Sequence, residues 1–145
     1  MLQRFETFVS GITACYKYIQ RIKAMEMTEF GLKGTHMMCI FLLSRYEDGL
    51  TAAVLCQLCA EDKAAISRTL NTLRDQGFIL SEGSAYRAKW RLTEQGEQVA
   101  EKLEKVIEQW VCIGGDGLTE EERTSFYNSL ERIATNLREN SKGNE

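Results

Sequence analysis

The chain has 145 residues, of which 43% are hydrophobic and 27% are charged, and it contains no proline. This composition is typical of one globular domain and argues against a disordered chain, a proline-rich linker and a polyproline segment. The formal net charge of −3 conceals one basic stretch, because residues 61–92 carry six cations against four anions. An acidic chain with a local basic segment is compatible with nucleic-acid binding, although ordinary scatter of charges would also produce it.

Several functional classes are disfavoured by what the sequence lacks. No stretch approaches the roughly 18 apolar residues of a transmembrane helix, and residues 1–6 do not resemble a secretory signal. We therefore expect a cytoplasmic protein without a membrane partner, whose five cysteines are reduced thiols. We see no nucleophile–base pair, phosphate-binding glycine loop or carboxylate dyad at a useful spacing, so we expect no enzyme, no cofactor and no metal.

Two helices are predicted in the first third of the chain. Residues 2–26 carry apolar side chains at alternating steps of three and four, which predicts one long amphipathic helix. The residues of this stripe are Leu2, Phe5, Val9, Ile12, Tyr16 and Ile19. After a turn at Gly31 and Gly34, residues 35–46 are apolar almost all round, which predicts a central, buried helix.

Two shorter helices follow. Thr51 is a plausible N-cap for a helix that ends near residue 59, and Asp62 is one for a helix over 63–76 that Gly77 ends. One face of the second helix is apolar, with Ile66, Leu70 and Leu73. The opposite face carries Ala64, Arg68, Asn71 and Asp75, with Ser67 and Thr72 at its flanks.

The remaining elements are a hairpin and two long helices. Residues 78–82 and 86–92 flank a glycine-containing turn, and the second run alternates apolar and cationic residues, as a half-buried strand does. Thr93 is expected to cap a helix that reaches residue 113, and residues 114–117 form a glycine-rich break. Thr119 and Glu122 form a capping box that begins the last helix.

The order of helix, turn, helix and hairpin over residues 51–92 is that of a winged helix-turn-helix. The second helix of such a unit presents a polar face that fits the major groove of DNA. The hairpin cations Arg87, Lys89 and Arg91 could lie along the phosphate backbone beside it. A winged helix used for protein contacts would show the same pattern.

Residues 50–79, followed by Leu92-Thr93-Glu94-Gln95-Gly96, resemble the winged helix-turn-helix and the Leu-Thr-x-x-Gly signature of MarR-type regulators. The resemblance implies a mainly α fold with a small β-hairpin wing, in one domain spanning residues 1–145. Residues 2–46 and 94–139 would form a helical dimerisation scaffold, and residues 50–92 the DNA-binding lobe. It also implies a homodimeric regulator of transcription, usually a repressor of a double-stranded operator, that a small ligand or thiol oxidation controls.

The resemblance implies which residues face DNA. On the second helix these are Lys63, Ala64, Ser67, Arg68, Asn71 and Thr72. Many relatives carry an Asp-Arg-Arg run in the wing; this chain has Ser84-Ala85-Tyr86-Arg87 there, and Arg87 would take the arginine's role. Lys89, on the same side of the alternating strand, would contact phosphates.

The sequence allows more than one interpretation of a possible effector site and of the thiols. Tyr16, Met37, Met38 and Phe41 could line a pocket for a small effector, or they could be ordinary core residues. Cys56 and Cys59 form a CxxC pair that could sense oxidants or metals, but we expect both to be small hydrophobes in the core of the lobe.

The other potential ligands are also expected to be structural. His36 and Cys39 have the spacing of two metal ligands on a helix, yet His36 is the only histidine of the chain. Cys15 and Cys112 lie on the predicted first and fifth helices, where we expect a packing role. A thiol- or metal-responsive regulator therefore stays an alternative to one controlled by a small ligand.

Overall fold

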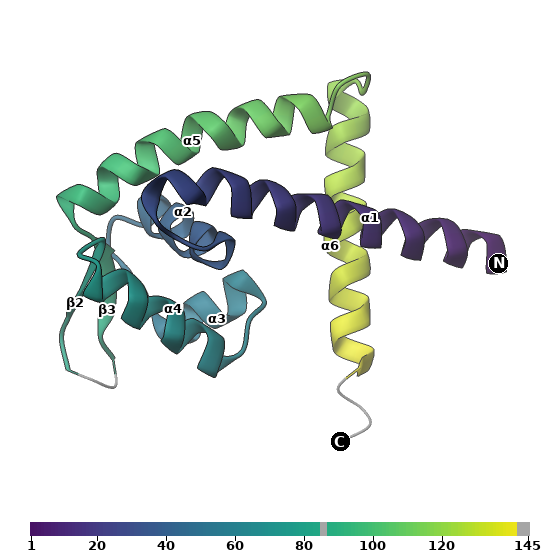
Figure 1. The fold of residues 1–145 in the computed structure, drawn as a ribbon. Coiled ribbons are helices and arrows are strands. Elements are labelled where there is room, and N and C mark those ends of the chain that lie inside the picture. The colour runs from purple at the N-terminus through teal and green to yellow at the C-terminus, as the bar shows by residue number, and fades with distance from the viewer. Residues whose placement is uncertain (85–86, 142–145) are drawn as a thin grey trace. The chain divides into compact units, whose positions relative to one another are not determined.

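A computed structural model describes residues 1–84 and 87–141. The chain divides into two compact units, Met1–Val106 and Ile107–Glu145, each of which is described here by itself. The boundary between these units lies inside a helix. It differs from the predicted division into a dimerisation scaffold and a DNA-binding lobe, and that division stays a prediction. The first unit contains the winged helix-turn-helix and the helices that precede it (Figure 1).

The first unit is built mainly from helices. Helix α1 spans Leu2–Met27, and the 3-10 turns η1 and η2 span Thr28–Phe30 and Gly34–His36. Helices α2, α3 and α4 span Met37–Arg45, Ala52–Cys59 and Lys63–Asp75. Strands β1, β2 and β3 span Leu50–Thr51, Ile79–Glu82 and Lys89–Leu92, and helix α5 spans Glu94–Gly114. The predicted fold class, mainly α with a small β wing, is confirmed.

The core of this unit lies around α2. Five of α2's nine residues are buried, as its nearly continuous apolar sequence predicts. Each helix of the unit contributes a side chain with no solvent exposure to this core; they are Met27 at the end of α1, Ile40, Leu55, Leu73 and Leu103. The rest of α1 is largely exposed, including most of its predicted apolar stripe.

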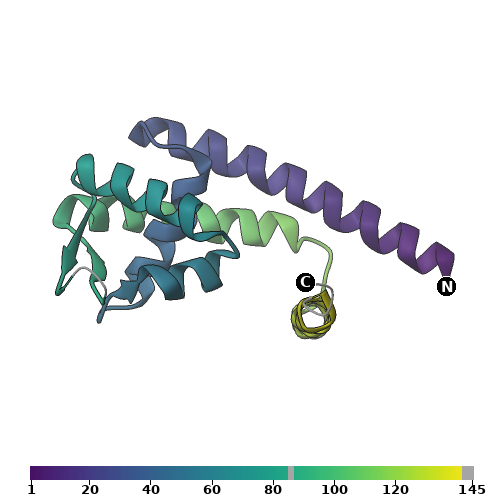
Figure 2. The ribbon, with the colours of Figure 1, turned by 90° about the horizontal axis from the view of Figure 1, so that it is seen from below.

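The helix-turn-helix begins at two side-chain caps, both at the predicted positions. The Thr51 hydroxyl accepts a hydrogen bond from the Val54 N–H at 3.4 Å and begins α3. The Asp62 carboxylate accepts one from the Ala65 N–H at 2.7 Å and begins α4. Each cap satisfies a backbone donor that has no partner inside its helix. Helices α3 and α4 pack side by side, and the hairpin of β2 and β3 adjoins α4 (Figures 1 and 2).

The sheet has one strand more than the sequence predicts. Its order is β1-β3-β2, with Leu50 opposite Trp90 and Glu82 opposite Lys89. A two-residue strand has no periodicity of its own, so β1 exists only through its pairing with β3. Gly49 permits this pairing, because it has a φ of +74° and any Cβ there would meet the Trp90 carbonyl oxygen at 2.8 Å. Strand β3 begins at Lys89, and the predicted strand residue Tyr86 lies outside the described residues.

The second unit contains the end of α5, a short turn and helix α6, Glu120–Ser141. The predicted capping box is confirmed: the Thr119 N–H donates to the Glu122 carboxylate at 2.8 Å, and the Thr119 hydroxyl accepts from the Glu122 N–H at 3.2 Å. Arg123 donates from its guanidinium to the Gly115 carbonyl at 2.7 Å, which ties the turn to α6. Across residues 1–84 and 87–141, no helix is long and apolar enough to cross a membrane.

Candidate nucleic-acid interface

Helix α4 separates an apolar face from a polar one. Ile66, Leu70 and Leu73 are buried, as their spacing predicts. The opposite face is open: five of the six α4 residues expected to face DNA are exposed, and Thr72 at the flank is half-buried. The exposed five are Lys63, Ala64, Ser67, Arg68 and Asn71. The structure therefore gathers these residues on one accessible surface of a rigid helix.

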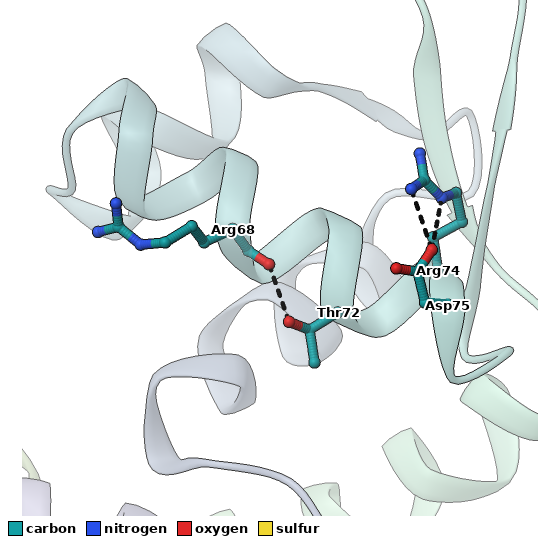
Figure 3. Close-up of polar contacts among 4 residues, drawn as sticks. All are labelled: Arg68, Thr72, Arg74 and Asp75. Carbon is teal, nitrogen blue, oxygen red and sulfur yellow. Dashed lines mark hydrogen bonds and ion pairs between the residues drawn. The ribbon is translucent and has the colours of Figure 1, made fainter.

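Arg68 lies near the centre of this surface. Its guanidinium extends away from the helix, while its backbone carbonyl accepts a hydrogen bond from the Thr72 hydroxyl at 3.0 Å (Figure 3). Among the described residues, Arg68 takes part in neither of the two ion pairs. A free guanidinium on an exposed helix face can make a bidentate contact to the edge of a guanine.

A second arginine of the same helix is already engaged. Arg74 donates two hydrogen bonds to Asp75, from Nε at 3.1 Å and from Nη2 at 3.0 Å (Figure 3). Both side chains are well exposed, so the pair contributes little to stability. The pair leaves Arg68 as the α4 arginine without such a partner in the described structure.

The three wing cations differ in their availability. Arg87 and Lys89 are exposed. Arg91, by contrast, is half-buried: its Nε lies 3.3 Å from the Glu82 carboxylate and its Nη2 donates to the Asp48 carbonyl at 3.4 Å. Arg91 thus joins β3 to β2 and to the turn before β1. The sequence pattern predicts all three on one solvent-facing side, and the structure leaves two of them exposed and the third half-buried.

A cavity of about 560 Å³ adjoins α4 within the first unit. It is formed by residues of α1, η2, α2 and α4, by the end of α3 and by the turns before η2 and after α3. The lining residues that matter below are Lys23, Lys33, His36, Met38, Cys59 and Arg68. Three cations and Glu61 line it, so the charge of its wall is positive when His36 is neutral. A positively charged cavity favours an anionic ligand.

The four residues proposed for an effector pocket are not brought together around this cavity. Met38 lines it. Met37 belongs to the core, with 5% of its surface exposed. The Phe41 ring lies under the Arg45 guanidinium, 5.7 Å from its carbon, and Tyr16 is 63% exposed on α1. Of the four residues predicted for an effector pocket, only Met38 lines this cavity. The prediction did not include Lys23 and Lys33, which also line it.

His36 is buried between α1 and α4 at the wall of this cavity. Its Nδ1 accepts a hydrogen bond from the Lys33 N–H at 3.2 Å. Burial, and secondly the positive charge of Lys33, lower the pKa of His36 below its ordinary value. In the described part of the chain there is no group of three or more histidine, cysteine, aspartate or glutamate side chains placed to hold a metal.

The five thiols occupy three kinds of environment. Cys15 and Cys112 are exposed, Cys56 and Cys59 are half-buried, and Cys39 is buried. Cys56 and Cys59 are thus less enclosed than the sequence led us to expect. A side-chain interaction with Cys59, and secondly burial, raise the pKa of the Cys39 thiol, and the same interaction lowers the pKa of Cys59. Sequence reasoning missed this pair, because the two residues lie on different helices and no local spacing connects them.

The fold is shared with known regulators. Residues 30–85 match the model of the MarR family. A MarR transcriptional regulator from Methanosarcina mazei Go1 is 24% identical, with a TM-score of 0.77 over 90% of this chain and 89% of that one.

Two further solved structures were determined with DNA. One is a protein from Listeria monocytogenes assigned to the MarR regulators, bound to a 26mer; it is 19% identical, with a TM-score of 0.84 over 94% of this chain and 95% of that one. The other is S. aureus MepR in complex with DNA; it is 17% identical, with a TM-score of 0.78 over 87% and 93%. The chain thus shares the fold of these solved structures, and its residues 30–85 match the MarR family model.

Proposed function

We propose that the protein is a homodimeric, DNA-binding regulator of transcription that reads a pseudo-palindromic operator. The observation that carries the proposal is the exposed polar face of α4, with a free Arg68 at its centre and the exposed wing cations Arg87 and Lys89 on the neighbouring hairpin. Similar chains from Listeria monocytogenes and S. aureus have been determined in complex with DNA, which supports this use of the fold.

The contacts would divide between reading and anchoring. With α4 in the major groove, Arg68 and Asn71 can reach base edges, where arginine pairs with guanine and asparagine with adenine. Lys63, Ser67 and Thr72 lie at the start or the flanks of this face, where a phosphate or a base is within reach. Arg87 and Lys89 on the wing would neutralise phosphates, which adds affinity and fixes the register without reading sequence.

Exposed apolar surface supports a homodimer. Leu2, Phe5 and Ile19 of α1 are each more than half exposed. In the second unit, Phe126 and Leu137 of α6 are also more than half exposed. Each surface is too apolar for a helix in water and would be covered by a second copy of the chain. A twofold axis would place two α4 helices about 34–36 Å apart, one turn of DNA.

Repression relieved by a small ligand is the mode of control we propose. The cavity beside α4 is lined by Met38 on one side and by Arg68 and Asn71 on the other. A ligand bound there would touch residues needed for DNA, and it would act only if it preferred the DNA-free state. Met38→Trp tests the site: a ligand cavity would accept the larger ring and alter operator affinity, whereas a packed core would lose about 1–3 kcal/mol of stability.

The proposal as a whole is tested by selecting duplexes from a random pool with the purified full chain. We expect enrichment of one inverted repeat whose half-sites lie about one helical turn apart. A winged helix that serves protein contacts would enrich no sequence, and that result would reject DNA reading. The variants Arg68→Ala and Arg74→Ala are compared in the same selection. The comparison distinguishes an arginine that contacts a base from one that is already paired with Asp75.

A further inference from the structure

The end of α1 and the turn that joins it to α2 carry cations beside the exposed face of α4. Lys33 directly precedes η2 and is exposed, and Lys23 near the end of α1 is half-buried. Both lysines line the cavity of about 560 Å³ that Arg68, Asn71 and Thr72 of α4 line as well. Two lysines from outside the helix-turn-helix therefore share a wall with α4 residues that are expected to face DNA.

The backbone of Lys33 is held in place. Its N–H donates a hydrogen bond to Nδ1 of His36 at 3.2 Å, and its carbonyl accepts one from the His36 N–H at 2.9 Å. The His36 side chain is buried, and Gly34 packs so closely on α1 that a Cβ there would meet the Ala24 nitrogen at 2.8 Å. Lys33 is thus presented from a fixed turn, so it loses less conformational freedom on binding than a lysine on a mobile loop.

The charges on the cavity wall favour an anion. Three cations line the cavity: Lys23, Lys33 and Arg68. Glu61 is the one acid among the described residues that line it, and none of the three cations takes part in the ion pairs of the described structure. Nδ1 of His36 accepts a hydrogen bond, so the neutral ring carries its proton on Nε2 and adds a donor to the wall. Such a wall attracts a negatively charged group.

The dimensions of DNA bring phosphates to this wall. The major groove is about 12 Å wide, and an α-helix with its side chains is about 10–12 Å across. When α4 occupies the groove, the two sugar-phosphate backbones therefore lie against its flanks. Ala65, Thr69 and Thr72 follow at intervals of four and three along the flank of α4 that lines the cavity. A backbone beside this flank passes the cavity, whose described lining includes no residue of β2 or β3.

We propose that Lys33, assisted by the charge of Lys23, binds a DNA phosphate beside α4 and forms a backbone anchor separate from the wing cations Arg87 and Lys89. The inference rests on the proposed function, because it takes α4 as the helix that enters the major groove. Lys33 supplies the exposed ammonium group, and Lys23 adds positive charge to the same wall. An anion bound in the cavity would compete for these lysines, which gives the proposed ligand control a direct route to DNA affinity.

The test is the salt dependence of binding to the selected operator, measured by fluorescence anisotropy with the full chain. Lys33→Ala should weaken binding severalfold on every duplex and lower the slope of log K against log salt by about one, because one phosphate contact is lost. Lys33→Arg keeps the charge and should retain most of the affinity. Lys17→Ala is the matched control, since Lys17 is an exposed lysine of α1 that does not line the cavity. Equal affinities and equal slopes in Lys33→Ala and Lys17→Ala would overturn the proposal.

A second measurement needs only the wild-type protein. Lysines are acetylated with an N-hydroxysuccinimide ester, with and without operator, and the modified positions are read by mass spectrometry. We expect Lys33 to react severalfold more slowly in the complex and Lys17 to react at an unchanged rate. Equal reaction of Lys33 in the free and bound protein overturns the anchor, even where Lys33→Ala fails to fold.

The two measurements also distinguish this inference from the proposed function. A wild-type chain that binds no duplex rejects both. A wild-type chain that binds its operator while Lys33 stays unprotected rejects the anchor alone and leaves DNA reading by α4 in place.

Discussion

The hydroxyl of Thr93 donates a hydrogen bond to the carbonyl oxygen of Gly77 at 2.6 Å, and it accepts one from the Gly96 N–H at 3.1 Å. The Thr93 N–H donates to the Phe78 carbonyl at 3.0 Å. One residue thus caps α5 and ties its start to the turn that ends α4. A Cβ at Gly96 would overlap the Phe78 carbonyl oxygen, so the close approach requires glycine. The Leu-Thr-x-x-Gly segment is therefore a junction between the end of α4 and the start of α5.

Breaking this junction should destabilise the protein. Thr93→Val removes an N-cap and a second hydrogen bond, for which we expect a loss of about 1–3 kcal/mol in the free energy of unfolding. Gly96→Ala should cost at least as much, because backbone must move. Urea denaturation measures both, and Gly114→Ala at the other end of α5 is the control, since no atom lies within 4 Å of its added methyl group. An unchanged unfolding free energy in Gly96→Ala would contradict the junction.

Arg68→Ala should weaken binding to the selected operator by about 1–3 kcal/mol and relax discrimination at one base position in each half-site. Arg74→Ala removes the same charge from the same helix, but from a side chain already paired with Asp75, and should have the smaller effect. Fluorescence anisotropy with operator duplexes carrying single base changes measures both. If the two variants lose the same affinity on every duplex, Arg68 contributes charge alone.

Lys89→Ala should weaken binding by a similar factor on all sequences and should lower the slope of log K against log salt by about one. The reason is that a phosphate contact releases a counterion but reads no base. Lys105→Ala, an exposed lysine of α5, is the charge-matched control. A salt slope that is identical in the two variants would show that β3 does not reach the backbone.

The chain should be a dimer at micromolar concentration, as measured by light scattering. Phe5→Glu places a charge on the exposed apolar stripe of α1 and should shift the protein towards the monomer. Gln3→Glu, an exposed polar position of the same helix, adds the same charge and should leave the dimer intact. A wild-type chain that stays monomeric would remove the basis for a two-half-site operator.

His36 should make folding stability depend on pH. Its pKa is lowered in the folded protein, so below about 6.5 the unfolded chain takes up a proton more readily than the folded one. Stability is therefore complete above that pH and falls as the pH drops towards the folded pKa. Lys33, Lys23, Glu61 and Cys59 surround the same cavity and contribute their own charges.

His36→Asn isolates the effect, because an amide oxygen can still accept the Lys33 N–H but does not titrate in this range. Urea denaturation at about pH 7.5 and about pH 5 should show a smaller difference in the variant than in the wild type. An equal difference in both proteins would assign the pH dependence to other groups.

The helices and their ends follow from local chemistry, which a sequence displays directly. Thr51, Asp62 and Thr119 each satisfy a backbone N–H three residues ahead, and that geometry depends on nothing distant. The apolar spacing of Ile66, Leu70 and Leu73 likewise predicts which face of α4 is buried, and hence which face is open to solvent. These features together were enough to indicate a winged helix-turn-helix.

Contacts between distant segments were decided by the tertiary structure alone. Strand β1 is too short to have a pattern and forms because Gly49 lets β3 approach. Arg91 alternates with Lys89 as a wing cation should, yet Glu82 and the Asp48 carbonyl engage it. The cavity wall shared by Met38 and Arg68 arises from how α1, α2, α3 and α4 pack. Periodicity says which face of a helix is buried, but the partner on that face is set by packing across the whole unit.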